Sequence, residues 1–333
     1  MPPPPFPQLS LSSTQVSLRE RCPRRWWFRY VGHWNGWLAD AAPDVQAAYK
    51  LGKLESVATW TGKRIHDGVS LLLRDPRSTA ASVMFETERK MRDEFRASNG
   101  VGAGRFGEPK AFRLEEHYFG AGVDERRLEE CISEIRTCLE AFERFCKSEP
   151  SLDFRSMTRA AAERRRFVHV DHEAIPMEAR GFKAMDIGDG QVTVYSAPDF
   201  VVETEDGRLV VIDWKTGSKW GPSENELTSQ LESYAAWLWL QHKPVVQRAN
   251  SVELYEFHLP NCTPAGRPAT TEDFERAAAR IRDQASRLLA LRGNAPAVPR
   301  QSCPPQPHPE GCRWCPFRKI CSEGSECLAA KKG

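Results

Sequence analysis

The first half of the chain carries apolar residues at helical spacing. This spacing runs from about Val45 to Leu73, and it predicts further helices over 79–97 and 125–147. A short helix is expected to begin earlier, because Ser12 and Gln15 have the spacing of a capping box. The N-terminal half is therefore predicted to be largely helical.

After about residue 164 the period changes from that of helices to that of strands. The stretch 166–175 alternates in part, and Val192–Val202 and Leu209–Trp214 are rich in β-branched residues. Between the last two, the dipeptide Asp206-Gly207 predicts a tight hairpin turn. Further along, the pattern predicts a helix over Asn225–Gln241, a strand over 251–258 and a helix over 272–292.

This order of elements indicates a mixed α/β core with a helical region in front of it. We divide the chain into a Pro-rich, disordered segment 1–9, a helical region 10–160, a core 161–293, and a linker with a cysteine cluster 294–333.

Composition narrows the class of protein only a little. Hydrophobic residues make up 40% and charged residues 28% of the 333 positions, which is sufficient for a packed core. The net charge of +2 does not by itself identify a nucleic-acid-binding protein, so a binding surface would have to be local. The longest apolar run, Tyr234–Leu240, is too short to cross a bilayer, and no signal peptide is visible. We expect a cytoplasmic protein without a membrane partner, in which clustered cysteines bind metal and do not form disulfides.

Two carboxylates and one ammonium are predicted to converge in the core. Asp213 and Lys215 are two residues apart on a predicted strand, so their side chains point to the same side. The turn at Asp206-Gly207 brings Asp199 onto the neighbouring strand. Carboxylate oxygens are the ligands that Mg²⁺ prefers, and a bound metal activates water for phosphodiester hydrolysis. A bare D-x-K spacing is common on exposed hairpins, but here it follows the apolar run Leu209–Ile212.

These residues resemble the signature of the PD-(D/E)XK nucleases, and in particular of their RecB-like branch. The matching motifs, in chain order, are Gly62-x-x-x-His66, Pro198-Asp199, Asp213-Trp214-Lys215 and Gln230-x-x-x-Tyr234. The resemblance implies a restriction-endonuclease-like sheet flanked by helices. It also implies that His66, Asp199 and Asp213 hold Mg²⁺ or Mn²⁺, helped by the Trp214 carbonyl.

The same resemblance assigns roles to the remaining motif residues. Lys215 would be the catalytic lysine, and Gln230 and Tyr234 would support the site and contact DNA. The implied activity is that of a deoxyribonuclease, an exonuclease that acts on single-stranded or free DNA ends.

A second candidate site is the cysteine cluster near the C-terminus. Cys312, Cys315 and Cys321 have the close spacing of metal or cluster ligands, and a fourth ligand is required. Local candidates would form a zinc knuckle, whereas the distant Cys22 would join the two ends of the chain. The local candidates are Cys303, Cys327 and His308.

The cysteine pattern also resembles the iron–sulfur members of the RecB-like branch. These include CRISPR-associated adaptation exonucleases and AddB-type nucleases, which use one early cysteine, usually followed by proline, and three late ones. Cys22-Pro23 and the set of Cys312, Cys315 and Cys321 match that pattern. The resemblance therefore implies a structural [4Fe–4S] cluster.

Arginines and tryptophans around Cys22 are candidates for DNA contact. Arginine binds phosphate, and an indole ring offers a stacking surface to an unpaired base. A solvated helix face above an aromatic core explains the same pattern, so both interpretations stay open. The residues are Arg19, Arg21, Arg24, Arg25, Arg29, Trp26 and Trp27.

The sequence leaves open the partner protein, two alternative functions and the pathway. The sequence contains no phosphate-binding G-x-x-x-x-G-K-[ST] motif, so any DNA unwinding must come from a helicase or another DNA-processing protein. The alternatives to a nuclease are a non-catalytic DNA-binding scaffold and a zinc-stabilised interaction module. CRISPR adaptation, DNA repair and phage DNA processing are all open as the pathway served.

Overall fold

A computed structural model describes residues 6, 8–107, 111–149, 152–170, 184–185, 187–188, 190–217 and 227–330. Its helices are α1 (Ser13–Arg21), α2 (Pro23–Tyr30), α3 (Pro43–Leu51), α4 (Val57–Arg74), α5 (Ala80–Gly100), α6 (Glu115–Phe119), α7 (Glu125–Ser148), α8 (Phe154–Glu163), α9 (Ser229–Gln241), α10 (Lys243–Arg248), α11 (Thr271–Arg292), α12 (Pro309–Arg313) and α13 (Ser322–Ala329), with 3₁₀ helices η3 (Arg300–Ser302) and η4 (Pro316–Lys319). Its strands are β1 (Leu9–Leu11), β2 (Val168–Val170), β3 (Ala184–Met185), β4 (Val192–Tyr195), β5 (Phe200–Glu203), β6 (Arg208–Lys215), β7 (Ser251–His258) and β8 (Thr263–Pro268).

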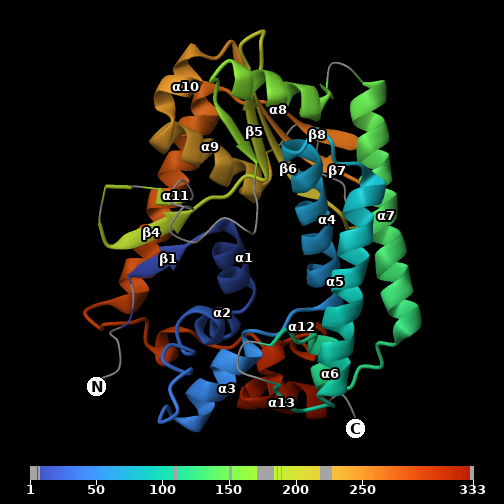
Figure 1. Ribbon diagram of the computed structural model, residues 1–333. Coiled ribbons are helices and arrows are strands. Elements are labelled where there is room, and N and C mark those ends of the chain that lie inside the picture. Colours follow the sequence, from blue (N-terminus) through green and yellow to red (C-terminus); the bar gives the residue numbers. More distant parts are fainter. Residues whose placement is uncertain are drawn as a thin grey trace.

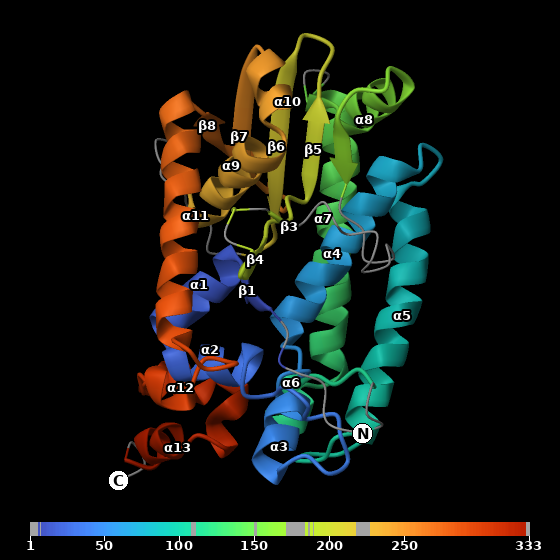
Figure 2. The ribbon, with the colours of Figure 1, turned by 90° about the vertical axis from the view of Figure 1, so that its left-hand side faces the viewer.

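A five-stranded mixed sheet in the order β2-β5-β6-β7-β8 is the central layer of the molecule. Helices cover both of its faces: α9 and α11 lie on one side, and α4, α7 and α8 lie on the other (Figures 1 and 2). The central strand β6 is consequently buried at all six of its interior positions. It runs parallel to β7 and antiparallel to β5.

Strand alternation divides the core into two clusters. Val210, Ile212 and Trp214 point to the side of α4 and α7, where they join an aromatic cluster. Leu209 and Val211 point to the opposite side and pack with α9 and α11. Because side chains alternate, Asp213 belongs to the face that α9 covers.

The predicted strand Val192–Val202 is wrong as a single element. The chain breaks at Ala197-Pro198 and forms two strands that belong to different sheets. Proline lacks the backbone N–H that a continuous ladder needs, so it ends the first pairing. The first strand, β4, pairs with β1 and β3, and the second strand, β5, starts directly after Asp199.

The helical spacing from Val45 to Leu73 corresponds to two helices. The first, α3, ends at Leu51, and Ser56 caps the start of α4 by accepting a hydrogen bond from the Thr59 N–H. Between them Glu55 forms a short bridge with Leu114, which satisfies backbone groups that a continuous helix would have bonded internally.

Most of the other predicted elements are confirmed. The helices over 79–97 and 125–147 are α5 and α7, the strand over 251–258 is β7, and the helix over 272–292 is α11. The turn at Asp206-Gly207 joins β5 to β6, with φ of 81° at Gly207.

Residues 171–175 of one predicted strand and 225–226 of one predicted helix lie outside the described residues. Strand β8 was not predicted, because Pro264 and Pro268 disfavour a strand anywhere except at a sheet edge, where it lies.

The N-terminal and C-terminal helices meet at one end of the molecule. Helix α2 lies beside α12 (Figures 1 and 2), and α3 contacts η4. The Phe28 and Phe317 rings stack there with centroids 5.3 Å apart, inside a small cluster that includes Leu51 and Tyr118. No helix in the described ranges combines the length and the apolar composition needed to cross a bilayer.

Candidate active site and cysteine cluster

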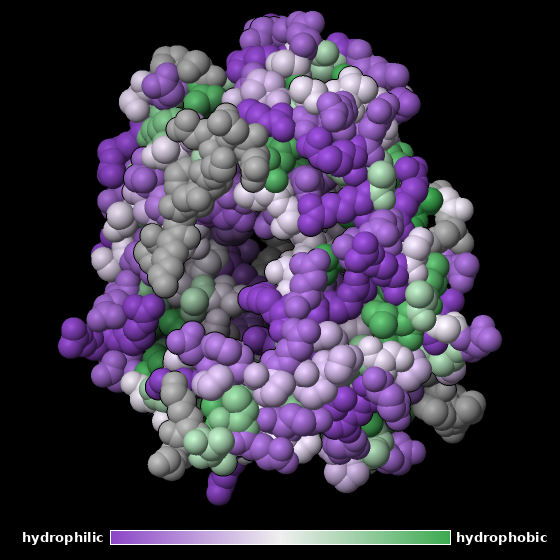
Figure 3. Space-filling view, turned by 180° about the vertical axis from the view of Figure 1, so that it is seen from behind, coloured by the Kyte–Doolittle hydropathy of each residue, from purple (hydrophilic) through white to green (hydrophobic). Residues whose placement is uncertain are grey.

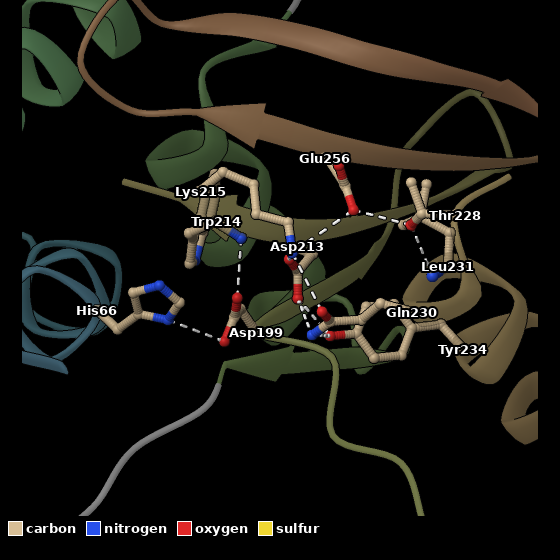
Figure 4. A network of polar contacts seen from close by, with 10 residues as sticks. All are labelled: His66, Asp199, Asp213, Trp214, Lys215, Thr228, Gln230, Leu231, Tyr234 and Glu256. Atoms are coloured by element: carbon tan, nitrogen blue, oxygen red, sulfur yellow. Dashed lines mark hydrogen bonds and ion pairs between the residues drawn. The ribbon is translucent and has the colours of Figure 1, made fainter. Parts of the chain in front are cut away.

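The register of three neighbouring strands places three carboxylates in one row. Phe200 pairs with Ile212, so Asp199, one residue before β5, comes opposite Asp213. On the other side of β6, Asp213 pairs directly with Glu256 of β7. The row lies at the carboxyl end of β6, beside α4 and α9 (Figure 4).

Asp213 is the buried centre of this row. Only 2% of its surface is exposed, and both of its oxygens accept hydrogen bonds. Oδ1 accepts from Gln230 Nε2 at 2.6 Å and from the Tyr234 hydroxyl, and Oδ2 lies 2.5 Å from Lys215 Nζ. Burial, together with the negative charge of Asp199, raises the pKa of Asp213 to about 6. The site thus favours added positive charge next to this carboxylate.

Asp199 links β6 to α4. Its Oδ2 accepts the backbone N–H of Trp214 at 2.8 Å, and its Oδ1 lies 3.2 Å from His66 Nδ1. Most of the His66 side chain is covered by the protein, and 36% of its surface remains exposed to solvent. Burial disfavours the charged imidazolium, but the carboxylate of Asp199 outweighs it and raises the pKa of His66 to about 9.

Helix α9 brings the amide and the phenol of the fourth motif to Asp213. Gln230 and Tyr234 are four residues apart and share one helix face. Gln230 accepts from Lys215 Nζ at 3.1 Å through Oε1, while its Nε2 donates to Asp213. Burial and the nearby Asp213 raise the pKa of Tyr234 well above 10, so the phenol remains a donor.

Lys215 is held as an ammonium. Burial disfavours its charge, but the neighbouring Asp213 and Glu256 outweigh this effect and raise its pKa. At neutral pH Lys215 is therefore a hydrogen-bond donor and a positive charge, not a base. Sequence spacing predicted the pairing of Asp213 with Lys215, and the two side chains do meet.

Glu256 is the residue of this network that motif analysis missed. It is 6% exposed, accepts from Thr228 Oγ1 at 2.8 Å, and lies 3.5 Å from Lys215 Nζ. Thr228 also caps α9, so one hydroxyl ties this helix to β7. A signal was present in the sequence, because Glu256 follows Val252 and Leu254 on the face of the strand that is expected to be buried.

The donor set fits a hard divalent cation. His66, Asp199 and Asp213 offer one imidazole and two carboxylates, which suit Mg²⁺ or Mn²⁺. In the described ranges, no three histidine, cysteine, aspartate or glutamate side chains are already close enough to share one ion. Donors occupy both oxygens of Asp213. A cation would have to displace the Lys215 ammonium from Oδ2.

The four cysteines of the second candidate site line one small cavity. Cys22 lies at the start of α2, Cys312 within α12, and Cys315 and Cys321 at the starts of η4 and α13. Backbone hydrogen bonds from Phe317 and Gly324 counteract the rise in pKa that burial causes at Cys315 and Cys321.

Gly324 lies at the edge of this cavity, next to two of the cysteines. A Cβ atom at this position would lie 3.5 Å from Cys321 Sγ and 3.7 Å from Cys312 Sγ. The residues present thus fit a group held by four thiolates. Neither Cys303, Cys327 nor His308 borders the cavity, and Cys303 is fully buried in the core beside α9 and α11.

The arginines and tryptophans around Cys22 separate into two groups. Arg19 and Arg24 point inward, where Arg19 bonds Gln284 and Arg24 bonds the Cys303 carbonyl. Trp26 is buried, whereas Trp27 is partly buried, packs against the core and donates to the Val298 carbonyl. The remaining arginines, Arg21, Arg25 and Arg29, line a separate cavity.

The pairing of His66 with Asp199 predicts a specific pH dependence in protein treated with EDTA. The folded pKa of about 9 lies above the unfolded value of about 6.5. The pair therefore stabilises the fold fully below pH 6.5 and loses this contribution as pH rises through 9. We expect the difference in unfolding free energy between wild type and His66→Gln, measured by urea denaturation, to shrink over this range. A difference that grows with pH would contradict the pairing, and exposed His308→Gln is the matched control.

The comparisons with known proteins agree with this geometry. The family model described as the PD-(D/E)XK nuclease superfamily matches residues 10–322. A search of curated proteins finds no match. The matched region contains the whole carboxylate network and the four cysteines, and the five-stranded mixed sheet flanked by helices is consistent with the restriction-endonuclease-like fold. The chain therefore belongs to the PD-(D/E)XK nuclease superfamily.

Proposed function

We propose that this protein is a metal-dependent deoxyribonuclease, an exonuclease that hydrolyses phosphodiester bonds at single-stranded DNA ends. One observation carries the nuclease part: Gln230 and Tyr234 of α9 and Lys215 of β6 hold the buried Asp213 carboxylate, and the pair of Asp199 with His66 of α4 lies beside it. The preference for ends rests on the resemblance of the four motifs to the RecB-like branch.

Different side chains of the site have different roles in the proposed hydrolysis. His66, Asp199, Asp213 and the Trp214 carbonyl would hold Mg²⁺ or Mn²⁺. Such an ion lowers the pKa of bound water and neutralises charge that develops on the phosphoryl oxygens. Lys215, released from Asp213, orients the attacking water or stabilises the same developing charge. Gln230 and Tyr234 keep Asp213 in place by donating to its Oδ1.

The central test is cleavage of end-labelled DNA. We expect wild type to degrade single-stranded DNA with Mg²⁺ or Mn²⁺ and to be inactive in EDTA. Lys215→Ala should lose roughly 10²-fold or more in rate, because it removes a charge that acts on the transition state. The exposed Lys90→Ala is the matched control and should cleave normally.

The same assay separates the enzyme from a non-catalytic scaffold. If wild type binds DNA but Asp213→Ala changes neither binding nor cleavage, the protein is a scaffold. A product ladder from circular single-stranded DNA would show endonuclease action and would exclude a strict requirement for ends.

Glu256 is proposed to position the catalytic lysine. Its carboxylate faces Lys215 Nζ and is itself fixed by Thr228. Glu256→Gln should slow cleavage roughly 10-fold, as expected when a supporting contact to a metal-site residue is lost. Its pH–rate profile should also shift, because Lys215 loses a neighbouring negative charge. Glu253→Gln, on the same strand but paired with Arg208, is the control, and equal effects of both variants would show a merely structural role.

We further propose that Cys22, Cys312, Cys315 and Cys321 hold a [4Fe–4S] cluster with a structural role. The support is the shared cavity, the backbone donors at Cys315 and Cys321, and the resemblance to iron–sulfur nucleases. About 300 residues separate Cys22 from Cys321, so ligand bonds close a long loop and offset its entropic cost.

Metal analysis and one pair of variants test this cluster. Protein purified without oxygen should contain iron and absorb visible light, and Cys22→Ser should lose both and melt at a lower temperature. Cys327→Ser should keep them, because Cys327 does not border the cavity. Zinc without iron would favour the zinc-stabilised interaction module instead.

A further inference from the structure

A large groove lies between the N-terminal helices and α4. Its volume is about 690 Å³, and its walls come from α1, α2, the segment after α3, the start of α4 and η4. In Figure 1 the N-terminal helices face α4 across the middle of the molecule. Seen from behind, the molecule is hollowed near its middle, and mainly hydrophilic residues surround the hollow (Figure 3).

The groove carries an excess of positive charge. In the described part of the chain, no carboxylate lies within ion-pair distance of Arg21, Arg25, Arg29 or Lys53, all of which line it. The two acidic residues of the lining are already neutralised by cations: Glu55 lies 2.8 Å from Lys63, and Glu115 lies 3.5 Å from Arg318. Unpaired cations facing one groove attract a polyanion.

Aromatic rings stand among these cations. The His33 and Tyr49 rings stack with centroids 6.3 Å apart, and Lys53 Nζ lies 5.2 Å from the Tyr49 centroid. Burial, with help from Lys53 and Arg29, lowers the pKa of His33 to about 4, so its ring is neutral at physiological pH. Cations interleaved with flat neutral rings are typical of sites for unpaired nucleotides.

One face of α4 leads from the groove to the catalytic residues. Thr59 and Lys63 line the groove, and His66 is three residues beyond Lys63, on the same face. The rise of an α-helix makes the distance from Thr59 to His66 about 10 Å along the axis. The wall of α4 stays close to β6, since a Cβ atom on Gly62 would lie 3.5 Å from Thr216 Oγ1.

We propose that this groove binds the single-stranded DNA substrate and guides it to the metal site. Arg21, Arg25, Arg29 and Lys53 contact its phosphates, and the bases stack against the rings of His33 and Tyr49. This inference rests on the proposed nuclease function and adds the path of the strand.

The cysteine site supports one wall of this path. Arg25 and Phe317 border both the groove and the cavity among the cysteines. Phe317 also lies between Cys315 and Cys321 in sequence and stacks on Phe28 of α2. A role of the cysteine site in shaping the groove follows from this shared wall.

Binding is tested in EDTA with full-length Lys215→Ala protein, so that the probe is not degraded. Fluorescence anisotropy with a labelled oligothymidylate should show that Arg21→Glu/Lys53→Glu binds at least 10-fold more weakly. The slope of log affinity against log salt should fall by about 1.4, because each lost phosphate contact on a single strand removes about 0.7. Lys90→Glu/Arg282→Glu has the same change in net charge on exposed outer helices and should bind normally.

Stacking is tested with Tyr49→Leu and an abasic oligonucleotide of equal length. Wild type should prefer the oligothymidylate roughly fivefold or more, and Tyr49→Leu should reduce this preference. Equal losses in both charge-reversed pairs, or tighter binding of blunt duplex than of single strand, would overturn the groove proposal. The Arg21→Glu/Lys53→Glu variant is also made in protein that keeps Lys215. Normal cleavage of single-stranded DNA by this variant would overturn the groove proposal and leave the nuclease function intact.

Discussion

The structure depends on placing three carboxylates side by side across β5, β6 and β7 without enough positive charge to neutralise them. Asp199, Asp213 and Glu256 are brought together by strand register alone, and Asp213 is almost fully buried. Like charges in a poorly solvated site repel each other strongly. Lys215, protonated His66 and the donors on α9 offset this repulsion, and a divalent cation would do so more completely. The repulsion lowers the stability of the fold, and the same excess of negative charge would favour the binding of a divalent cation.

The remaining architecture serves to hold that row. Strand β6 is covered on both faces, so Asp213 and Lys215 have little freedom to move toward solvent. Thr228 connects the start of α9 to Glu256, and the backbone of Trp214 fixes Asp199. Helix α9 and its cap thus restrain Asp213 and Glu256, and strand β6 restrains Asp199.

The helical N-terminal region completes the site. Helix α4 brings His66 to Asp199 at the carboxyl end of β6, and its earlier residues line the groove that we propose for the DNA strand. The four cysteines line a cavity between α2 and the C-terminal helices, and Arg25 and Phe317 border both this cavity and the groove. The carboxylate network, the proposed DNA groove and the proposed cluster site are therefore each built from segments that lie far apart in the sequence.

The sequence by itself determined the elements and the chemistry of the motifs. Helical and strand periodicity predicted α5, α7, β7 and α11, because these elements are long and amphipathic or bounded by clear turns. Spacing paired Asp213 with Lys215 and Gln230 with Tyr234, since residues at i+2 on strands and i+4 on helices share a face. The hairpin turn added Asp199, and the family resemblance added His66. The cysteine spacing selected Cys312, Cys315 and Cys321, and resemblance to a family pattern added Cys22; the four line one cavity.

Only the tertiary structure decided which of these residues meet and which others join them. Glu256 entered the site through the parallel pairing of β6 with β7, which no local pattern specifies. Packing also turned Arg19 and Arg24 inward while Arg21, Arg25 and Arg29 faced the groove, although all five share one short basic stretch. Side-chain direction across distant segments depends on which surfaces bury one another, and single-sequence periodicity does not contain that information.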